Sequence, residues 1–245
     1  MTKDQRGRSK SGEGMHRAWD KYRETDAEYF KYIAWLERQR FDTRELVFNY
    51  PVFVGQVNLA RHLMMYDLYA RVRELSGNIA DIGTFKGASF LFFAKLVALF
   101  ERASTTQVHG FDWFRGMAPG RRDSTKAGQY RASYGMLSAM VRRQGLGDVA
   151  VLHRMDLVRQ FSPFLDRNPQ MRFKLSFVDC GIEAVLNAVV GPLWQRTVPG
   201  GIMIFDHYGS EASPTESAAV EAVIGSCRIR HFPHVRQATA YVIKE

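Results

Sequence analysis

Five acidic residues of this 245-residue chain each follow a short apolar run of the kind that forms a buried β-strand. They are Asp81, Asp112, Asp156, Asp179 and Asp206. In an open sheet of parallel strands, ligands bind beyond the carboxyl ends of the strands, where the strand order reverses. The sequence therefore predicts a row of carboxylates along one edge of a sheet, which suits a cation or hydroxyl groups better than an anion.

The first of these acids opens a glycine turn, DIGTFKGAS, at residues 81–89. Gly83 can adopt a positive φ, and Gly87 would let a ligand come close to the backbone. Three residues separate the two glycines, so the turn matches neither of the common phosphate-binding patterns, GxGxxG and GxxxxGK. Asp81 would repel a phosphate but attract an ammonium or sulfonium group, and S-adenosylmethionine carries both.

The next two acids suit an adenosine group. Asp112 follows the second strand-like run, where a carboxylate can bind both ribose hydroxyls. Asp156 follows the third run and is placed to meet the adenine amino group. An acid at a strand end can instead cap the helix that follows, and this alternative stays open for all three acids.

A second group of polar residues, Asp179, Asp206 and His207, follows the fourth and fifth strand-like runs. Two carboxylates and an imidazole at one edge could bind a divalent metal and a substrate hydroxyl, whose pKa the metal would lower. A carboxylate or a neutral histidine could then take the proton. The alternative is an internal hydrogen-bond network without a metal.

Strand-like and helix-like runs alternate from residue 79 onward, which predicts a doubly wound α/β sheet. The strand-like runs are residues 79–82, 107–111, 149–152, 175–178, 202–205, 228–232 and 239–243. The helix-like runs are residues 89–100, 127–143, 183–195 and 216–224. No helix separates the last two strand-like runs, so we expect them to form an antiparallel edge.

Residues 1–14 are basic and polar, without the apolar segment of a signal peptide, and we expect a disordered tail. Residues 15–76 are expected to form a helical extension that covers the core or a partner subunit, and residues 77–245 to form the ligand-binding domain. The longest apolar run, FLFFAKLVALF, is interrupted by Lys95 and is too short to span a membrane.

Two cysteines without a CxxC or zinc-ligand pattern favour a reducing, cytoplasmic location. The net charge of +9 favours an anionic partner, such as a nucleotide-linked substrate or a nucleic acid. Residues 114–128 hold glycines, a proline and several cations, which is typical of a mobile loop over an active site. We expect Arg115, Arg121 or Arg122 to meet an anionic part of the substrate; a plain solvated loop is the alternative.

Taken together, these motifs resemble class I S-adenosylmethionine-dependent methyltransferases, in particular the macrocin O-methyltransferase family of sugar O-methyltransferases. The turn at residues 81–89 is similar to that family's acid-x-Gly-x-x-x-Gly-x-Ser turn. The segments DWFRG, DCG and DHYG, which begin at Asp112, Asp179 and Asp206, resemble the family's DSFEG, DGD and DDYG. The likeness covers the chain from about Tyr66 to the end.

This resemblance implies a Rossmann-like, seven-stranded sheet whose last strand is antiparallel. It implies a magnesium ion between Asp179, Asp206 and position 207, with Asp179 as the general base. It also implies that S-adenosylmethionine lies over the glycine turn and the following acids: Asp81, Gly83, Thr84, Phe85, Lys86, Gly87, Ser89, Asp112, Trp113, Asp156 and Asp179.

Two positions depart from the family's pattern, because Gly181 and His207 stand where the family has acids. A histidine ligand favours zinc, iron or manganese over magnesium. Either the metal is manganese or a similar ion, or no metal is bound and His207 acts as the base.

We therefore expect an S-adenosylmethionine-dependent O-methyltransferase that acts on a hydroxyl of a sugar or a similar small molecule, with magnesium or manganese as the candidate metal. We also expect a homo-oligomer that forms through the N-terminal helices. An RNA methyltransferase and a non-catalytic scaffold on the same fold are the alternatives. Salt-dependent substrate binding would favour the first, and failure to bind S-adenosylmethionine would favour the second.

Overall fold

The computed structural model of this chain describes residues 23–121, 123, 126–209, 215–225, 228–232, 235 and 240–245. The predicted tail, the first eight residues of the predicted extension and Arg122 lie outside them. The strands are β1 (Asn78–Ile82), β2 (Val108–Asp112), β3 (Ala150–Arg154), β4 (Phe173–Val178), β5 (Thr197–Phe205) and β6 (Ala240–Ile243). The helices are α1 (Arg23–Leu36), α2 (Thr43–Phe48), α3 (Tyr50–Phe53), α4 (Gln56–Val72), α5 (Ala88–Phe100), α6 (Tyr134–Arg143), α7 (Leu157–Arg167), α8 (Glu183–Arg196) and α9 (Glu216–Ile224).

The described strands form one sheet in the order β3-β2-β1-β4-β5-β6. Strand β1 pairs in parallel with both β2 and β4, so the strand order reverses between β1 and β4. Strand β6 runs antiparallel to β5, as predicted for the last strand. The reversal marks the place where a doubly wound sheet binds its ligand.

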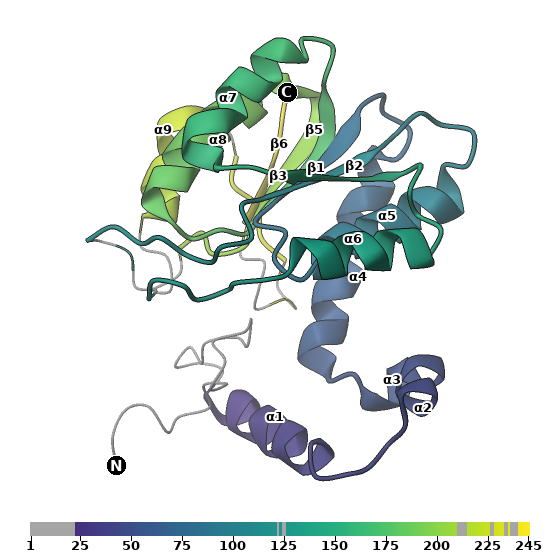
Figure 1. The fold of residues 1–245 in the computed structure, drawn as a ribbon. Coiled ribbons are helices and arrows are strands. Elements are labelled where there is room, and N and C mark those ends of the chain that lie inside the picture. The colour runs from purple at the N-terminus through teal and green to yellow at the C-terminus, as the bar shows by residue number, and fades with distance from the viewer. Residues whose placement is uncertain are drawn as a thin grey trace.

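Helices cover both faces of the sheet (Figure 1). Because successive strand residues point to opposite faces, Ile79 belongs to the core under α4, α5 and α6, whereas Ala80 belongs to the core under α7, α8 and α9. Phe93 of α5 and Phe161 of α7 are fully buried in these two cores. Burying aromatic side chains on both faces holds the parallel strands between two helical layers.

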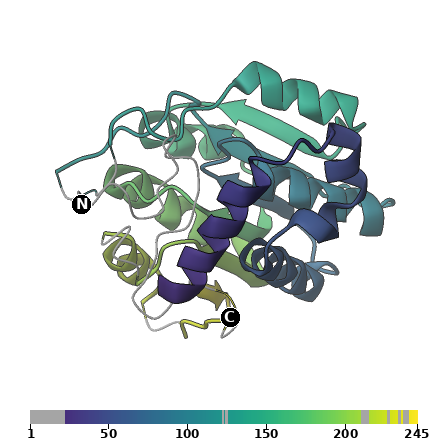
Figure 2. The same ribbon diagram turned by 90° about the horizontal axis from the view of Figure 1, so that it is seen from below.

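The first helices lie outside these layers, at the far end of α4 (Figures 1 and 2). Tyrosines of α1 connect it to the segment that follows. Asn58 donates a hydrogen bond to the hydroxyl of Tyr29 at 2.7 Å, and the hydroxyl of Tyr32 donates to the carbonyl of Phe53 at 2.8 Å. Helices α2 and α3 contain no buried residue.

The structure differs from the sequence-based prediction in three elements. The predicted strand at residues 228–232 forms a single antiparallel bridge, between Arg230 and Tyr241, so the described sheet has six strands and the seventh stays a prediction. The helix predicted from residue 127 begins at Tyr134, because Tyr130 adopts a φ of +59° and Ser133 caps the helix. Helix α7 was not predicted, although Asp156 caps its first turn.

The described part of the chain contains no helix with the length and apolar character needed to cross a bilayer.

Candidate active site

The turn between β1 and α5 lies against the end of β4. Gly83 has a φ of +82°, and a Cβ atom at this position would clash with the backbone carbonyl of Asp179. Gly87 has a φ of +89°, and a Cβ atom there would meet Leu137 of α6. The sequence suggested that Gly87 lets a ligand approach. The structure shows that it lets α6 approach, and its contact with a ligand stays a prediction.

Asp81 is a buried carboxylate at the base of this turn. It is 1% exposed, and among the described residues neither of its carboxylate oxygens has a hydrogen-bond partner of good geometry. The hydroxyl of Thr84 donates instead to the backbone carbonyl of Asp81, at 3.1 Å. Burial raises the pKa of Asp81 to about 7, although the hydroxyls of Ser89 and Thr84 act to lower it. A buried carboxylate without a well-aligned donor is suited to pair with a positively charged ligand group.

Asp112, at the end of β2, holds the backbone of two loops. One of its carboxylate oxygens accepts a hydrogen bond from the N–H of Phe85 at 2.8 Å, and the other accepts one from the N–H of Phe114 at 2.6 Å. Burial raises the pKa of Asp112, and these backbone donors act in the opposite direction. A carboxylate has about four lone-pair sites, so Asp112 can still accept hydrogen bonds from a ribose. The indole of Trp113 donates to the carbonyl of Gly116 at 2.5 Å.

Three non-glycine residues near Asp112 have a left-handed backbone. They are Phe85, Phe114 and Tyr130, with φ values of +50°, +62° and +59°. The rings of Phe85 and Tyr130 meet edge to face, 5.6 Å apart, and the exposed Lys86 lies over the ring of Phe85 at 5.6 Å. Such conformations cost about 1–3 kcal/mol each and cluster at functional sites.

Asp156, which the sequence predicted to meet an adenine, caps a helix. Its side chain accepts a hydrogen bond from the N–H of Val158 at 3.0 Å, at the first turn of α7. Arg159 lies 3.8 Å from the other carboxylate oxygen. The capping alternative therefore describes the contacts of Asp156, and its role in cofactor binding stays a prediction.

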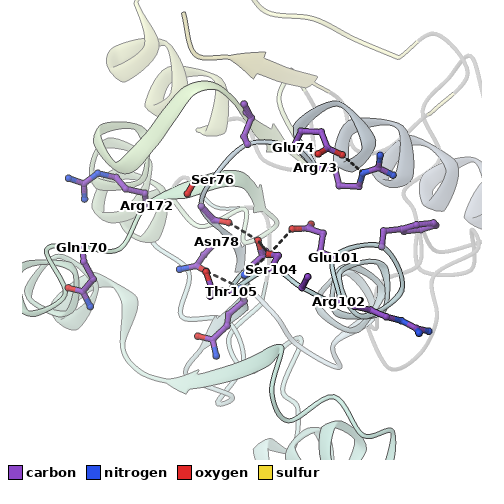
Figure 3. A pocket seen from close by; sticks show the side chains of 16 residues that line it. Arg73, Glu74, Ser76, Asn78, Glu101, Arg102, Ser104, Thr105, Gln170 and Arg172 are labelled. Atoms are coloured by element: carbon purple, nitrogen blue, oxygen red, sulfur yellow. Dashed lines mark hydrogen bonds and ion pairs between the residues drawn. The ribbon is translucent and has the colours of Figure 1, made fainter.

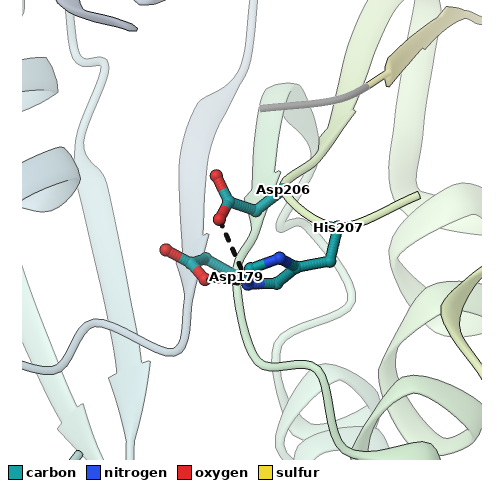
Figure 4. Close-up of side chains that lie close together, drawn as sticks. All are labelled: Asp179, Asp206 and His207. Carbon is teal, nitrogen blue, oxygen red and sulfur yellow. Dashed lines mark ion pairs between the residues drawn. The ribbon is translucent and has the colours of Figure 1, made fainter. Parts of the chain in front are cut away.

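The second predicted group, Asp179, Asp206 and His207, does converge at the carboxyl edge (Figure 4). One potential ligand atom from each residue lies within 4.8 Å of the others. The Nε2 atom of His207 is 3.3 Å from Asp206 Oδ2 and 3.6 Å from Asp179 Oδ1. Glu216 accepts a hydrogen bond from the backbone N–H of His207 at 3.1 Å, which fixes this histidine on its loop.

Arg61 of α4, which the sequence analysis missed, joins this cluster. Its guanidinium lies 3.1 Å from Asp179 Oδ2 and 2.8 Å from Asp206 Oδ1. Burial acts to lower the pKa of Arg61, but attraction to Asp206 and Asp179 outweighs burial and raises it. The sequence does carry a signal: Arg61 stands four residues after Val57 and seven before Leu68, on the apolar stripe of a helix.

The donor set of Asp179, Asp206 and His207 would suit a divalent metal if it stood alone. In this structure each carboxylate has one oxygen facing Arg61 and the other facing His207. A magnesium-type ion requires about six oxygen ligands, several of them unshared with another cation. The residues as they are arranged do not fit a metal ion.

An open pocket of about 840 Å³ lies at the opposite, amino-terminal edge of the sheet (Figure 3). Its walls include Asn78, Glu101, Arg102, Ser104 and Arg172. Glu101 is held by the ammonium of Lys174 at 2.7 Å and by the hydroxyl of Tyr69 at 2.8 Å. The pocket lies at the other edge of the sheet from the Asp179 cluster, and the charge of Glu101 in it is compensated by Lys174.

A doubly wound sheet with an antiparallel last strand and carboxylates at the point of strand reversal is the architecture of a Rossmann-like methyltransferase. Residues 80–208, more than half of the chain, match the family model described as a methyltransferase domain, and the chain belongs to this family. It is a methyltransferase, and the identification from the sequence is confirmed. Arg61 lies outside the matched residues.

Solved structures share this fold. The structure described as the calicheamicin methyltransferase CalS11 has a TM-score of 0.78 and 24% identity, over 96% of this chain and 99% of that chain. A second CalS11 structure, described as an apo TDP-rhamnose 3'-O-methyltransferase, has a TM-score of 0.74 and 24% identity, over 94% and 96%. The O-methyltransferase NovP has a TM-score of 0.61 and 15% identity, over 75% and 79%. No curated protein sequence matches this chain.

Proposed function

We propose that this methyltransferase moves the methyl group of S-adenosylmethionine to a hydroxyl group of a nucleotide-linked sugar or a similar small molecule. The observation that supports the proposal most strongly is the buried carboxylate of Asp81. It lies beside the strand reversal between β1 and β4, where a doubly wound sheet binds its ligand.

In this proposal the ammonium group of the cofactor supplies the partner that Asp81 lacks. A positive charge a few ångströms from a buried carboxylate is strongly attracted in a medium of low dielectric constant. Asp112 then accepts the ribose hydroxyls with its remaining lone pairs. TomG from Streptomyces achromogenes, solved in complex with S-adenosylmethionine, supports the choice of cofactor through its fold, with a TM-score of 0.50.

The transfer itself needs positioning more than covalent chemistry from the protein. The acceptor oxygen forms a bond to the methyl carbon, the bond from carbon to sulfur breaks, and the acceptor proton goes to a base. Holding the reacting atoms in line can supply about 7–11 kcal/mol. We assign the base to Asp179, because its side chain is 33% exposed whereas that of Asp206 is 1% exposed; His207 is the next candidate.

The acceptor class follows from charge and from fold. The net charge of +9 and the exposed Arg115 and Arg121, on the loop after β2, favour an anionic acceptor such as a sugar nucleotide. CalS11, which shares this fold over nearly its whole length, is described as a TDP-rhamnose 3'-O-methyltransferase. Closure of residues 114–128 over the substrate is part of this proposal.

The test is transfer of a labelled methyl group from S-adenosylmethionine to TDP-rhamnose and a panel of other sugar nucleotides. Asp179→Asn should lower turnover by about 10²–10⁴-fold, the range for loss of a general base, and should leave the affinity for S-adenosylhomocysteine unchanged. Asp166→Asn, at an exposed position of α7, is the matched control and should be fully active.

Three outcomes would contradict the proposal. Full turnover in Asp179→Asn would remove its role as base. Transfer to RNA with none to sugars would establish the nucleic-acid alternative. Failure of the wild-type protein to bind S-adenosylhomocysteine would favour a scaffold.

Self-association through the N-terminal helices is a further part of the proposal. Val47, Phe48 and Val52 of α2 and α3 are 66%, 83% and 73% exposed, which is unusual for apolar side chains that lie together. The flanking Arg44 and Glu45 carry opposite charges, as suits contact with a second copy. Light scattering should give a mass above 28.0 kDa, and Phe48→Ser with Val52→Ser should lower it to that of the monomer. A monomeric wild-type protein would contradict this.

The division at residue 77 into a helical extension and a methyltransferase domain, and the cytoplasmic location, remain predictions from the sequence. Metal assistance by Asp179, Asp206 and His207 also remains a prediction from the sequence. A metal there would have to share the two carboxylates with Arg61.

A further inference from the structure

Four side chains in the cluster alternate between acid and base around a closed ring. Arg61 contacts Asp179 Oδ2 and Asp206 Oδ1, at 3.1 and 2.8 Å. His207 Nε2 contacts the remaining oxygen of each carboxylate, at 3.6 and 3.3 Å. The two carboxylates are therefore bridged twice, once by a guanidinium and once by an imidazole.

The guanidinium is placed as a permanent part of this ring. The side chain of Arg61 is 18% exposed, and its guanidinium carbon lies 5.2 Å from the centre of the Phe177 ring. Guanidinium is always charged, is planar, and offers several N–H groups in a fixed geometry that suits two carboxylates at once. Removing it would leave Asp206, 1% exposed, as a buried charge without this partner.

A divalent ion between two carboxylates performs the same electrostatic task. It would hold both acids in place and neutralise their mutual repulsion. Arg61 already does this with one positive charge, and a second cation a few ångströms from it would be repelled.

We infer that Arg61 is the resident cation of the Asp179–Asp206–His207 cluster and takes the position that a divalent metal would otherwise hold. A metal ion enters only when Arg61 is displaced or removed. Arg61 is then a positioning residue for Asp179. It is supplied by α4, outside the residues that match the methyltransferase family.

The test is binding of Mn²⁺ to the full chain, measured by calorimetry and by electron paramagnetic resonance. Wild type should bind Mn²⁺ at least tenfold more weakly than Arg61→Met, because the variant leaves two carboxylates and an imidazole uncompensated. Adding Asp179→Asn to Arg61→Met should remove the gained affinity. Arg73→Met is the matched control, since Arg73 pairs with Glu74 on the surface at 2.9 Å, and it should behave as wild type.

Wild type also provides a test that needs no variant to fold. Its melting temperature and its affinity for S-adenosylhomocysteine should be the same in Mn²⁺ and in a chelator. Tight Mn²⁺ binding by wild type, or a large rise in its melting temperature with Mn²⁺, would overturn the inference. A folded Arg61→Met variant that binds Mn²⁺ no more tightly than wild type would also overturn the inference. The inference concerns the same site as the proposed function, but these readings do not depend on methyl transfer. Failure of one is thus distinguishable from failure of the other.

Discussion

Strand β4 has a charged side chain near each end, and the two ends differ in how that charge is compensated. At the start of the strand, Lys174 is fully buried and donates to Glu101 at 2.7 Å, to Thr106 at 3.2 Å and to the carbonyl of Arg73 at 3.1 Å. An ammonium has three donors, so each has an acceptor here. Just beyond the other end, Asp179 shares Arg61 with a second carboxylate.

The carboxyl end also contains Asp81, a buried acid that is not part of this ion-paired group. In the described residues, the two buried oxygens of Asp81 have no hydrogen-bond donor of good geometry, whereas Glu101 accepts from both Lys174 and Tyr69. The group around Lys174 is therefore structural, whereas Asp81 is suited to bind a ligand. A fully satisfied buried network stabilises the fold, and an unsatisfied one at a sheet edge marks a binding site.

The largest effect is expected from removing the buried cation at the start of β4. Lys174→Met should lower the free energy of unfolding by about 3–5 kcal/mol, because it leaves Glu101 as a buried charge without its cation. Urea denaturation measures this, with Lys95→Met at an exposed position of α5 as the control. Affinity for S-adenosylhomocysteine should be unchanged where the variant is folded. A small loss of stability would show that the pair is not essential to the fold.

A smaller effect is expected from a change in the glycine turn between β1 and α5. Gly83→Ala should lower the free energy of unfolding by about 1–3 kcal/mol, because it combines a φ of +82° with a clash against the carbonyl of Asp179. Gly145→Ala is the control, since its φ is +67° but a Cβ atom there would meet nothing within 4 Å. Gly83→Ala should also weaken cofactor binding, and Gly145→Ala should not. Equal effects on binding would contradict the close approach of the turn to β4.

Local sequence patterns could predict the strand ends and the glycine turn, because alternation, glycine and acid positions are read within a few residues. They could not place Arg61, which lies 118 residues from Asp179 and meets it only through the packing of α4 on the sheet. The left-handed backbone of Phe85 and Tyr130 is also a product of tertiary contacts, since aromatic residues rarely prefer it. Helix α7 was not predicted, although its buried residues Leu157, Phe161 and Leu165 recur at the spacing of one helix face.

The pH dependence of stability also reports on the buried carboxylate of Asp81. Burial raises the pKa of Asp81 from its usual 3.8 to about 7, so between these values the folded protein keeps a proton that the unfolded chain has lost. Stability due to this group therefore falls as the pH rises from 3.8 to 7, by up to about 1.4 kcal/mol per pH unit. The free energy of unfolding of Asp81→Asn minus that of wild type should increase over this range.

The titration of the buried His109 and the half-buried His153 acts in the opposite direction. Burial lowers the pKa of each from 6.5 to about 4, so their contribution to stability is present above 6.5 and is lost as the pH falls to 4. Both proteins contain this pair, so it cancels in the difference between them. A difference that stays constant with pH would contradict the raised pKa of Asp81.

The central claim, that Asp81 receives the ammonium group of the cofactor, is tested most directly by titrating S-adenosylhomocysteine into the protein calorimetrically. The titration is done near pH 6 in two buffers of different ionisation enthalpy. Binding should release nearly one proton in wild type, because Asp81 must ionise to pair with the ammonium. Asp81→Asn should bind at least tenfold more weakly and release none. Binding without proton release in wild type, or equal affinity in Asp81→Asn, would contradict the account.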